Sequence, residues 1–222
     1  PLGSTVINLN VPCDAVEGAT FARFRLSSVG GLAPTGPAMD GEVEDYTIVS
    51  RGSDFGDAPN SYGTTFASGG PLHGVSTTTP LFLGACIQTE NDASLPLDAT
   101  GDDISAGDQT VGTCAVANDD EDGVVIPMLI ACQSATIAVT ANAAGLLDAW
   151  IDWNRDGDFL DAGERIATSR ALTTGSNNLV VAVPCTTVAG ASFARFRFSS
   201  AGVASPGGIS PDGEVEDYAV TQ

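Results

Sequence analysis

Two short stretches decide the fold, and each of them occurs twice. Residues 193–197 read Phe-Ala-Arg-Phe-Arg, and residues 212–218 read Asp-Gly-Glu-Val-Glu-Asp-Tyr. The same letters stand 172 residues earlier, at 21–25 and 40–46. Around them, residues 12–48 align with residues 184–220 without a gap, and 22 of the 37 positions are identical. A match of this length does not arise by chance, so the chain contains an internal repeat.

The repeat predicts the domain organisation. A period of 172 residues is the size of a whole domain rather than of one turn of a solenoid. We expect residues 5–50 to be the C-terminal part of a preceding repeat and residues 51–222 to be one complete repeat. That repeat divides into an N-terminal region with the sequence DFGDAP, 51–123, and a β-sandwich, 124–222. Residues 1–4 are typical of the remnant of a cleaved expression tag and carry no fold information.

The hydrophobic pattern favours an all-β fold. Short apolar or alternating runs are separated by Gly, Pro, Asn and Asp clusters, and no helical period is sustained over three turns. These runs are 81–83, 135–140, 147–153, 179–183, 193–198 and 215–220. We therefore predict a β-sandwich repeat module, immunoglobulin-like or jelly-roll-like, with long acidic loops.

The two repeated stretches also predict how their strands pair. Alternation places Arg195 and Arg197 on one strand face, and Glu214 and Glu216 share a face in the same way. If these strands are neighbours, the arginines can face the glutamates as a cross-strand charge ladder. The equivalent ladder in the first copy consists of Arg23, Arg25, Glu42 and Glu44. The alternative is that one or more of the glutamates binds a metal or a partner.

Composition excludes several functions. The 222 residues include 28 acidic and 8 basic side chains, for a formal charge of −20, and all the basic residues are arginine. Nucleic-acid binding needs a basic surface, so it is excluded. No apolar run approaches the roughly 20 residues that span a bilayer, so we expect no membrane insertion of this segment. The surplus carboxylates either solvate the surface or collect divalent cations.

The five cysteines indicate disulfides. They have no CxxC spacing, and the sequence contains a single histidine, so a zinc site is disfavoured. Cys13 and Cys185 occupy equivalent positions of the repeat, so Cys13 should pair with the counterpart of Cys132 in a preceding repeat. This predicts bridges Cys132–Cys185 and Cys86–Cys114 and leaves Cys13 unpaired. Disulfides persist in oxidising compartments, so we expect a secreted or cell-surface protein.

Residues 152–164, DWNRDGDFLDAGE, predict a calcium loop. Oxygen-bearing side chains at positions one, three, five and seven, with glycine at position six, suit a hard cation that one short loop must enclose. Glu164 falls at position thirteen rather than twelve, and strand patterns flank the loop, so this is not an EF-hand. The expected ligands are Asp152, Asn154, Asp156, Asp158, Asp161 and Glu164.

A second acidic cluster stands immediately before an apolar run. Adjacent carboxylates repel one another unless solvent or a cation neutralises them, so either a second metal site or a solvated linker fits this cluster. Its members are Asp119, Asp120, Glu121 and Asp122.

The sequence gives no support for catalysis. The single histidine, His73, accompanies no GxSxG nucleophile motif. Trp150 and Trp153 could form a sugar-binding platform, although alternation places one of them inward and favours a core position for it. We therefore expect a non-enzymatic protein.

Together these motifs resemble a known family. GEVEDY at 41–46 and 213–218, the DWNRDGD segment, the RFR strand, DFGDAPNSYGT at 54–64 and DDEDGV at 119–124 resemble the GEVED domain of bacterial secreted and surface proteins. The resemblance implies large extracellular multi-repeat proteins, commonly adhesin-like, built of β-sandwich modules to which no enzymatic activity is assigned.

The expected function follows from these parts. We expect a structural, Ca²⁺-stabilised tandem-repeat module of an extracellular adhesin, fibre or matrix protein. Its partners would be neighbouring repeats or copies of itself, joined by strand complementation, or a surface glycan or protein. The alternative is a calcium-dependent carbohydrate-binding module or an accessory domain of a secreted enzyme.

Overall fold

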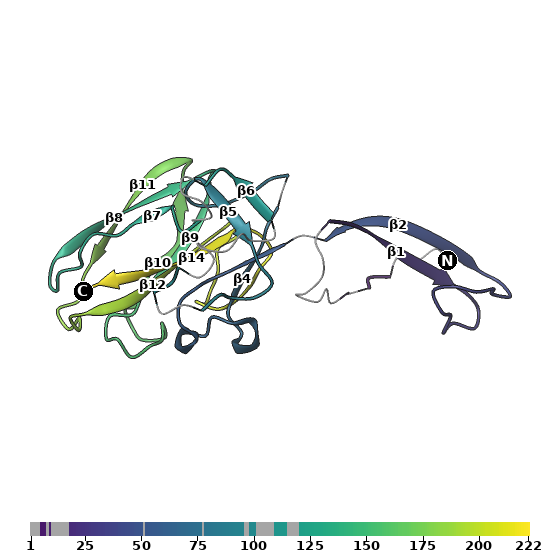
Figure 1. The fold of residues 1–222 in the computed structure, drawn as a ribbon, viewed down its shortest axis with the longest axis horizontal. Coiled ribbons are helices and arrows are strands. Elements are labelled where there is room, and N and C mark those ends of the chain that lie inside the picture. Colours follow the sequence, from purple (N-terminus) through teal and green to yellow (C-terminus); the bar gives the residue numbers. More distant parts are fainter. Residues whose placement is uncertain are drawn as a thin grey trace. The chain divides into compact units, whose positions relative to one another are not determined.

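The computed structural model describes residues 5–7, 9, 18–50, 52–76, 78–95, 98–100, 109–114 and 120–222. The chain divides into two compact units, Pro1–Arg51 and Gly52–Gln222. Apart from two short 3₁₀ helices, every regular element of the described residues is a β-strand (Figure 1). The predicted all-β class is therefore confirmed.

The first unit contains one hairpin. Strand β1 (Gly18–Leu26) pairs antiparallel with β2 (Glu42–Ser50), in a register that runs from Gly18 opposite Ser50 to Leu26 opposite Glu42. Its large apolar side chains are exposed on both faces of this two-stranded sheet: Phe21, Phe24, Leu26, Val43, Ile48 and Val49.

The second unit contains a sandwich of two antiparallel sheets. One sheet has the strand order β10-β9-β12-β14 and the other β11-β8-β7. Their strands are β7 (Val124–Val125), β8 (Ser134–Ala141), β9 (Gly145–Ile151), β10 (Arg165–Leu172), β11 (Gly175–Ala182), β12 (Ala191–Ser199) and β14 (Glu214–Thr221).

The core lies between these two sheets. Alternate residues of β8, among them Ile137 and Val139, pack with Leu147 of β9 and with Phe196 and Phe198 of β12. All five side chains are fully buried. The period-two alternation of the sequence thus places one apolar face of each sheet inward.

Two smaller sheets complete the unit. One has the order β13-β4-β3, built from β3 (Ser53–Phe55), β4 (Pro71–Gly74) and β13 (Gly208–Ser210). The 3₁₀ helices η1 (Asn60–Tyr62) and η2 (Phe66–Ser68) connect β3 to β4. The other is the hairpin of β5 (Cys86–Thr89) and β6 (Gln109–Gly112).

Both predicted disulfides are formed. Cys86 bonds to Cys114 across the β5–β6 hairpin, and Cys132 bonds to Cys185 between the segments that flank β8 and β11. Cys13 lies outside the described residues. Over the part of the chain that the structure describes, no helix is long and apolar enough to cross a membrane.

The Asp-Gly that opens each repeated motif fixes the entry into the second strand of each hairpin. Asp212 accepts hydrogen bonds from the backbone and hydroxyl of Ser200, and Asp40 accepts the same two from Ser28. Gly213 has φ 101°, and a Cβ there would lie 1.8 Å from the carbonyl oxygen of Phe198. Only glycine fits this close approach.

The register of β12 and β14 corrects the predicted charge ladder. The strands do pair, but Asp217 lies opposite Arg195 and Val215 lies opposite Arg197. The two glutamates lie opposite Phe196 and Phe198, on the other face. The ladder predicted between Arg195, Arg197, Glu214 and Glu216 is therefore wrong. The first copy behaves alike, since Asp45 lies opposite Arg23, and Glu42 and Glu44 lie opposite Leu26 and Phe24.

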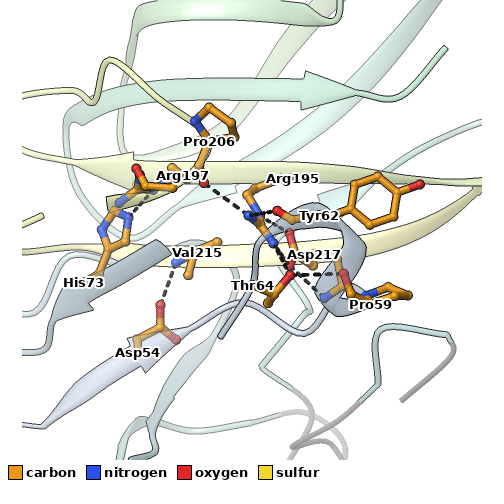
Figure 2. A network of polar contacts seen from close by, with 12 residues as sticks. Asp54, Pro59, Tyr62, Thr64, His73, Arg195, Arg197, Pro206, Val215 and Asp217 are labelled. Carbon is orange, nitrogen blue, oxygen red and sulfur yellow. Dashed lines mark hydrogen bonds and ion pairs between the residues drawn. The ribbon is translucent and has the colours of Figure 1, made fainter. Parts of the chain in front are cut away.

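Arg195 and Asp217 form a fully buried, bidentate ion pair (Figure 2). Nε and Nη2 of Arg195 each donate to one oxygen of Asp217 at 2.8 Å. Nη2 also donates to the hydroxyl of Thr64, and Nη1 donates to the carbonyl oxygens of Tyr62 and Pro206. The segment that follows β3 therefore supplies part of the shell around this guanidinium.

Arg197 is buried beside this pair and has no carboxylate hydrogen-bonded to it. Its Nε donates to Nε2 of His73 at 2.9 Å (Figure 2). Its other nitrogens donate to the carbonyl oxygens of Ser205, Gly207 and Gly208. Burial and the charge of Arg195 lower the pKa of Arg197 to about 10. Four acceptors compensate the guanidinium at neutral pH.

The variant Asp217→Asn removes the charge that compensates Arg195. We expect the free energy of unfolding of the second unit to fall by about 3–5 kcal/mol, because an uncompensated charge remains buried. Urea unfolding followed by tryptophan fluorescence measures this, since Trp150 and Trp153 are the only tryptophans and both belong to this unit. The matched control Asp45→Asn, at the solvent-exposed equivalent, should leave the transition unchanged. Equal effects of the two substitutions would contradict the assignment.

His73 should make stability depend on pH. It is fully buried, and burial followed by the charge of Arg197 lowers its pKa well below its usual value. The unfolded chain takes up a proton below about pH 6.5, whereas the folded chain does not, so stability falls as pH decreases through that value. We expect a slope of up to about 1.4 kcal/mol per pH unit that is absent in His73→Gln. Both proteins contain the same carboxyl groups, so the contribution of these groups cancels when one pH profile of stability is subtracted from the other. Parallel pH profiles would refute the expectation.

Candidate metal centre

The predicted calcium loop connects β9 to β10. It begins with Asp152, directly after Ile151, and ends with Glu164, whose carbonyl oxygen accepts a hydrogen bond from the backbone of Ile151. Arg155 and Gly157 have positive φ angles, of 64° and 94°. Gly157 therefore makes the sharp turn that the sixth position of a calcium loop requires.

Three of the predicted ligands come together. Carboxylate oxygens of Asp152, Asp156 and Glu164 all lie within 4.8 Å of one another. Oxygens that share a Ca²⁺ ion at 2.3–2.6 Å are separated by no more than about 5 Å, so this trio fits the ion. Asp152 and Glu164 are buried, and Asp156 is exposed.

Backbone donors orient the two buried carboxylates. Asp152 Oδ1 accepts from the amide of Arg155 at 2.5 Å, and Oδ2 accepts from that of Gly157 at 3.2 Å. Glu164 accepts from the amides of Trp153 and Asp161. Burial, with smaller contributions from the charges of Asp152 and Asp156, raises the pKa of Glu164 to about 7. A bound cation would lower this pKa again, because it stabilises the charged carboxylate.

The other predicted ligands lie at the edge of this trio. Asn154 donates through Nδ2 to the carboxylates of Asp156 and Asp161, at 3.0 and 2.5 Å. Asp158 instead accepts a hydrogen bond from the amide of Leu160. The seventh position of a calcium loop normally contributes its backbone carbonyl, so the side chain of Asp158 is not needed as a ligand.

A residue far away in sequence supports the loop. The hydroxyl of Tyr62 donates to Asp152 Oδ2 at 2.7 Å, and the Tyr62 ring packs against Phe159 and Phe193. Arg155 ties the loop to the segment before β12 by donating to the carbonyls of Ala189 and Ala191. No local pattern in the sequence connects positions 90 residues apart, so the contact between Tyr62 and Asp152 could not be predicted.

The second acidic cluster is held by backbone donors. Asp120 is buried and accepts from the amide of Gln88 at 2.7 Å, and Asp122 accepts from that of Ala85 at 2.8 Å. Glu121 is half-buried, and Asp119 lies outside the described residues. The solvated-linker alternative is therefore wrong for Asp120.

The two tryptophans do not form a sugar platform. Both indoles are buried, and Trp153 Nε1 donates to the carbonyl oxygen of Gly163 within the candidate loop. Arg165 covers the ring of Trp150. A carbohydrate site in this module therefore cannot use these two indoles as its platform.

Fold and site together define a disulfide-bonded, all-β module with an acidic loop after its central strand. The family model of the GEVED domain matches residues 1–49 and 146–221, which together are more than half of the chain. The chain therefore belongs to the GEVED-domain family. Comparisons with curated proteins and with solved structures returned no match.

Proposed function

We propose that this chain is a structural, Ca²⁺-stabilised tandem-repeat module of an extracellular adhesin, fibre or matrix protein. The observation that carries the proposal is the hairpin β1–β2. It repeats the internal hydrogen bonding of β12–β14, yet it exposes the side chains that the second unit buries. This surface is complementary to counterparts of the segments that cover β12–β14.

The internal bonding of the two hairpins is the same. Arg23 pairs with Asp45 through two bonds of 2.7 Å and donates to the carbonyl of Pro34, as Arg195 does to Asp217 and Pro206. Arg25 donates to the carbonyls of 33, 35 and 36, which are equivalent to those that Arg197 uses. The hairpin's own sequence thus supplies the partners of both arginines.

The burial of the two hairpins differs sharply. Phe24 is 40% exposed and Val43 53%, whereas the equivalent Phe196 and Val215 are 0% and 2% exposed. The Arg23 side chain is 44% exposed, against 0% for that of Arg195. Strands β8 and β9 and the segment 52–76 bury these positions in the second unit. We infer that counterparts of these segments cover the first hairpin, supplied either by the repeat to which the hairpin belongs or by another copy.

Calcium and disulfides suit this mechanical role. Calcium would fix the loop that joins β9 to β10, and the bridges Cys86–Cys114 and Cys132–Cys185 limit unfolding. Disulfides persist in oxidising compartments, which supports a secreted or cell-surface location. The role requires no catalysis, and the single histidine is buried against Arg197.

Calcium should raise the melting temperature. At a concentration of 100 times the dissociation constant, we expect a rise of about 5–10 °C relative to EGTA, measured by differential scanning calorimetry. Asp156→Ala should reduce this rise, because it removes a member of the carboxylate trio. The control Asp158→Ala should preserve it, since that side chain lies outside the trio. A rise that Asp156→Ala leaves intact would refute the loop as a calcium site.

The exposed hairpin should drive self-association. We expect the weight-average mass from size-exclusion light scattering to increase with concentration, and Phe24→Ser to reverse this increase by removing an apolar contact. Phe66→Ser is the matched control, because Phe66 is comparably exposed, at 44%, but belongs to the second unit. A strict monomer at all concentrations, or equal effects of both variants, would count against strand complementation.

A further inference from the structure

The sheet β11-β8-β7 carries no charged side chain, although the protein has 28 acidic residues. Its strands belong to two segments, 123–147 and 171–194, and neither contains Asp, Glu, Arg or Lys. The outward side chains of this sheet alternate with the buried ones and are either apolar or short and polar. They are Val125, Ser134, Thr136, Ala138, Thr140, Ser176, Asn178, Val180 and Ala182.

Strand β11 is the open edge of this sheet (Figure 1). It pairs with β8 without a bulge, from Gly175 opposite Ala141 to Ala182 opposite Ser134. Among the described residues, no strand and no backbone hydrogen bond lies on its other side. The strand contains neither proline nor charge, which are features that normally prevent an edge from pairing. It therefore presents an intact row of backbone donors and acceptors.

The other edges of the sandwich are protected. Strand β10 shows two register shifts against β9, carries two arginines and places Ser169 at a positive φ of 42°. On β14, the amide of Val215 already donates to Asp54 at 2.6 Å. Strand β7 contains only two residues. Of the edges in the described sandwich, β11 alone is long, regular and free of charge.

Both ends of β11 are held in place. Asn177 accepts from the amide of Thr173 at 3.0 Å and donates to the carbonyls of Thr173 and Gly175, so it stabilises the turn that enters the strand. The disulfide Cys132–Cys185 links the segment after β11 to the segment before β8. The edge is thus pre-formed, and little conformational entropy is lost when another strand pairs with it.

We propose that β11 pairs antiparallel with β11 of a second copy of this chain, about a twofold axis, so that the two sheets become one continuous sheet. Two copies that each carry a formal charge of −20 repel one another, and at this edge their sheets bring no carboxylates face to face. A basic partner would be drawn to the carboxylates elsewhere. A charge-free edge favours a partner that is itself acidic, and a second copy is such a partner.

This contact goes beyond the proposed docking of the β1–β2 hairpin and uses none of its residues. Hairpin docking would complete one module, whereas β11 pairing would join two modules side by side. One strand edge buries less surface than the two faces of a hairpin. We therefore expect β11 pairing to be weaker and to become populated only at higher protein concentration.

The test uses the full chain with Phe24→Ser, so that hairpin docking does not contribute, and measures mass by sedimentation equilibrium up to millimolar concentration. We expect monomers and dimers but no larger species, because a twofold contact closes on itself. Adding Val180→Glu should weaken dimerisation by about tenfold or more, because it places like charges on both copies at the contact.

Val125→Glu is the matched control for Val180→Glu. Val125 is 69% exposed and Val180 68%, and both substitutions add one negative charge to the same sheet face. Val125 lies on β7, at the opposite edge of the sheet. The control should therefore dimerise like its parent.

Hydrogen exchange identifies the strand that forms the contact. The amides of residues 175–182 should exchange more slowly at concentrations where the Phe24→Ser chain dimerises than after dilution. Val180→Glu should abolish this difference, and Val125→Glu should preserve it.

Three results would refute the pairing. One is a monomer at the highest concentration, and another is a dimer in which residues 175–182 exchange as fast as in the monomer. The third is equal weakening by Val180→Glu and Val125→Glu, because the sheets would then pack by their faces. Should circular dichroism show Val180→Glu unfolded, Asn178→Glu on the same strand decides, and unchanged dimerisation in it would refute the proposal.

Discussion

The buried pair of Arg195 and Asp217 is the constraint on which the rest of the second unit depends. A guanidinium that loses all contact with water must place each of its donors on an acceptor. Asp217 satisfies two of these donors, and Thr64 and the carbonyls of Tyr62 and Pro206 satisfy others. The segment after β3 is therefore an obligatory layer of the module rather than a linker. The same segment places Tyr62 against Asp152, so the ion pair and the candidate metal loop share one support.

Local patterns in the sequence predicted the strands, the all-β class and both disulfides. Alternation suffices for strands because one face of each sheet is apolar. The pairing of the cysteines followed from the equivalence of Cys13 and Cys185 in the repeat. The charge ladder failed because register depends on the connection between strands, which alternation does not specify. Here Asp212 and Gly213 place Asp217 rather than Glu216 opposite Arg195.

The sequence could not predict the contacts that complete the sites. The carboxylates of the 152–164 loop were recognisable because one short segment supplies them. By contrast, Tyr62 reaches Asp152 across 90 residues, and Leu83 reaches Glu214 across 131. Such contacts depend on how the layers of the fold pack against one another, and the hydrophobic periodicity of the sequence does not specify this packing. The acidic run before β7 was ambiguous for the same reason, since burial of Asp120 depends on residue 88.

The repeated motif contains residues that act within the hairpin and residues that contact other segments of the fold. In both units the hairpin is held together by residues of the motif and of the preceding strand. These are the Asp-Gly, the second aspartate and the two arginines, so the polar contacts within the hairpin need no covering segment. The glutamates of the motif instead contact segments outside the hairpin, since Glu214 accepts from the amide of Leu83 and Glu216 accepts from that of Gly123. In the proposed assembly, a repeat that covers the first hairpin would bring counterparts of these segments to Glu42 and Glu44 as well.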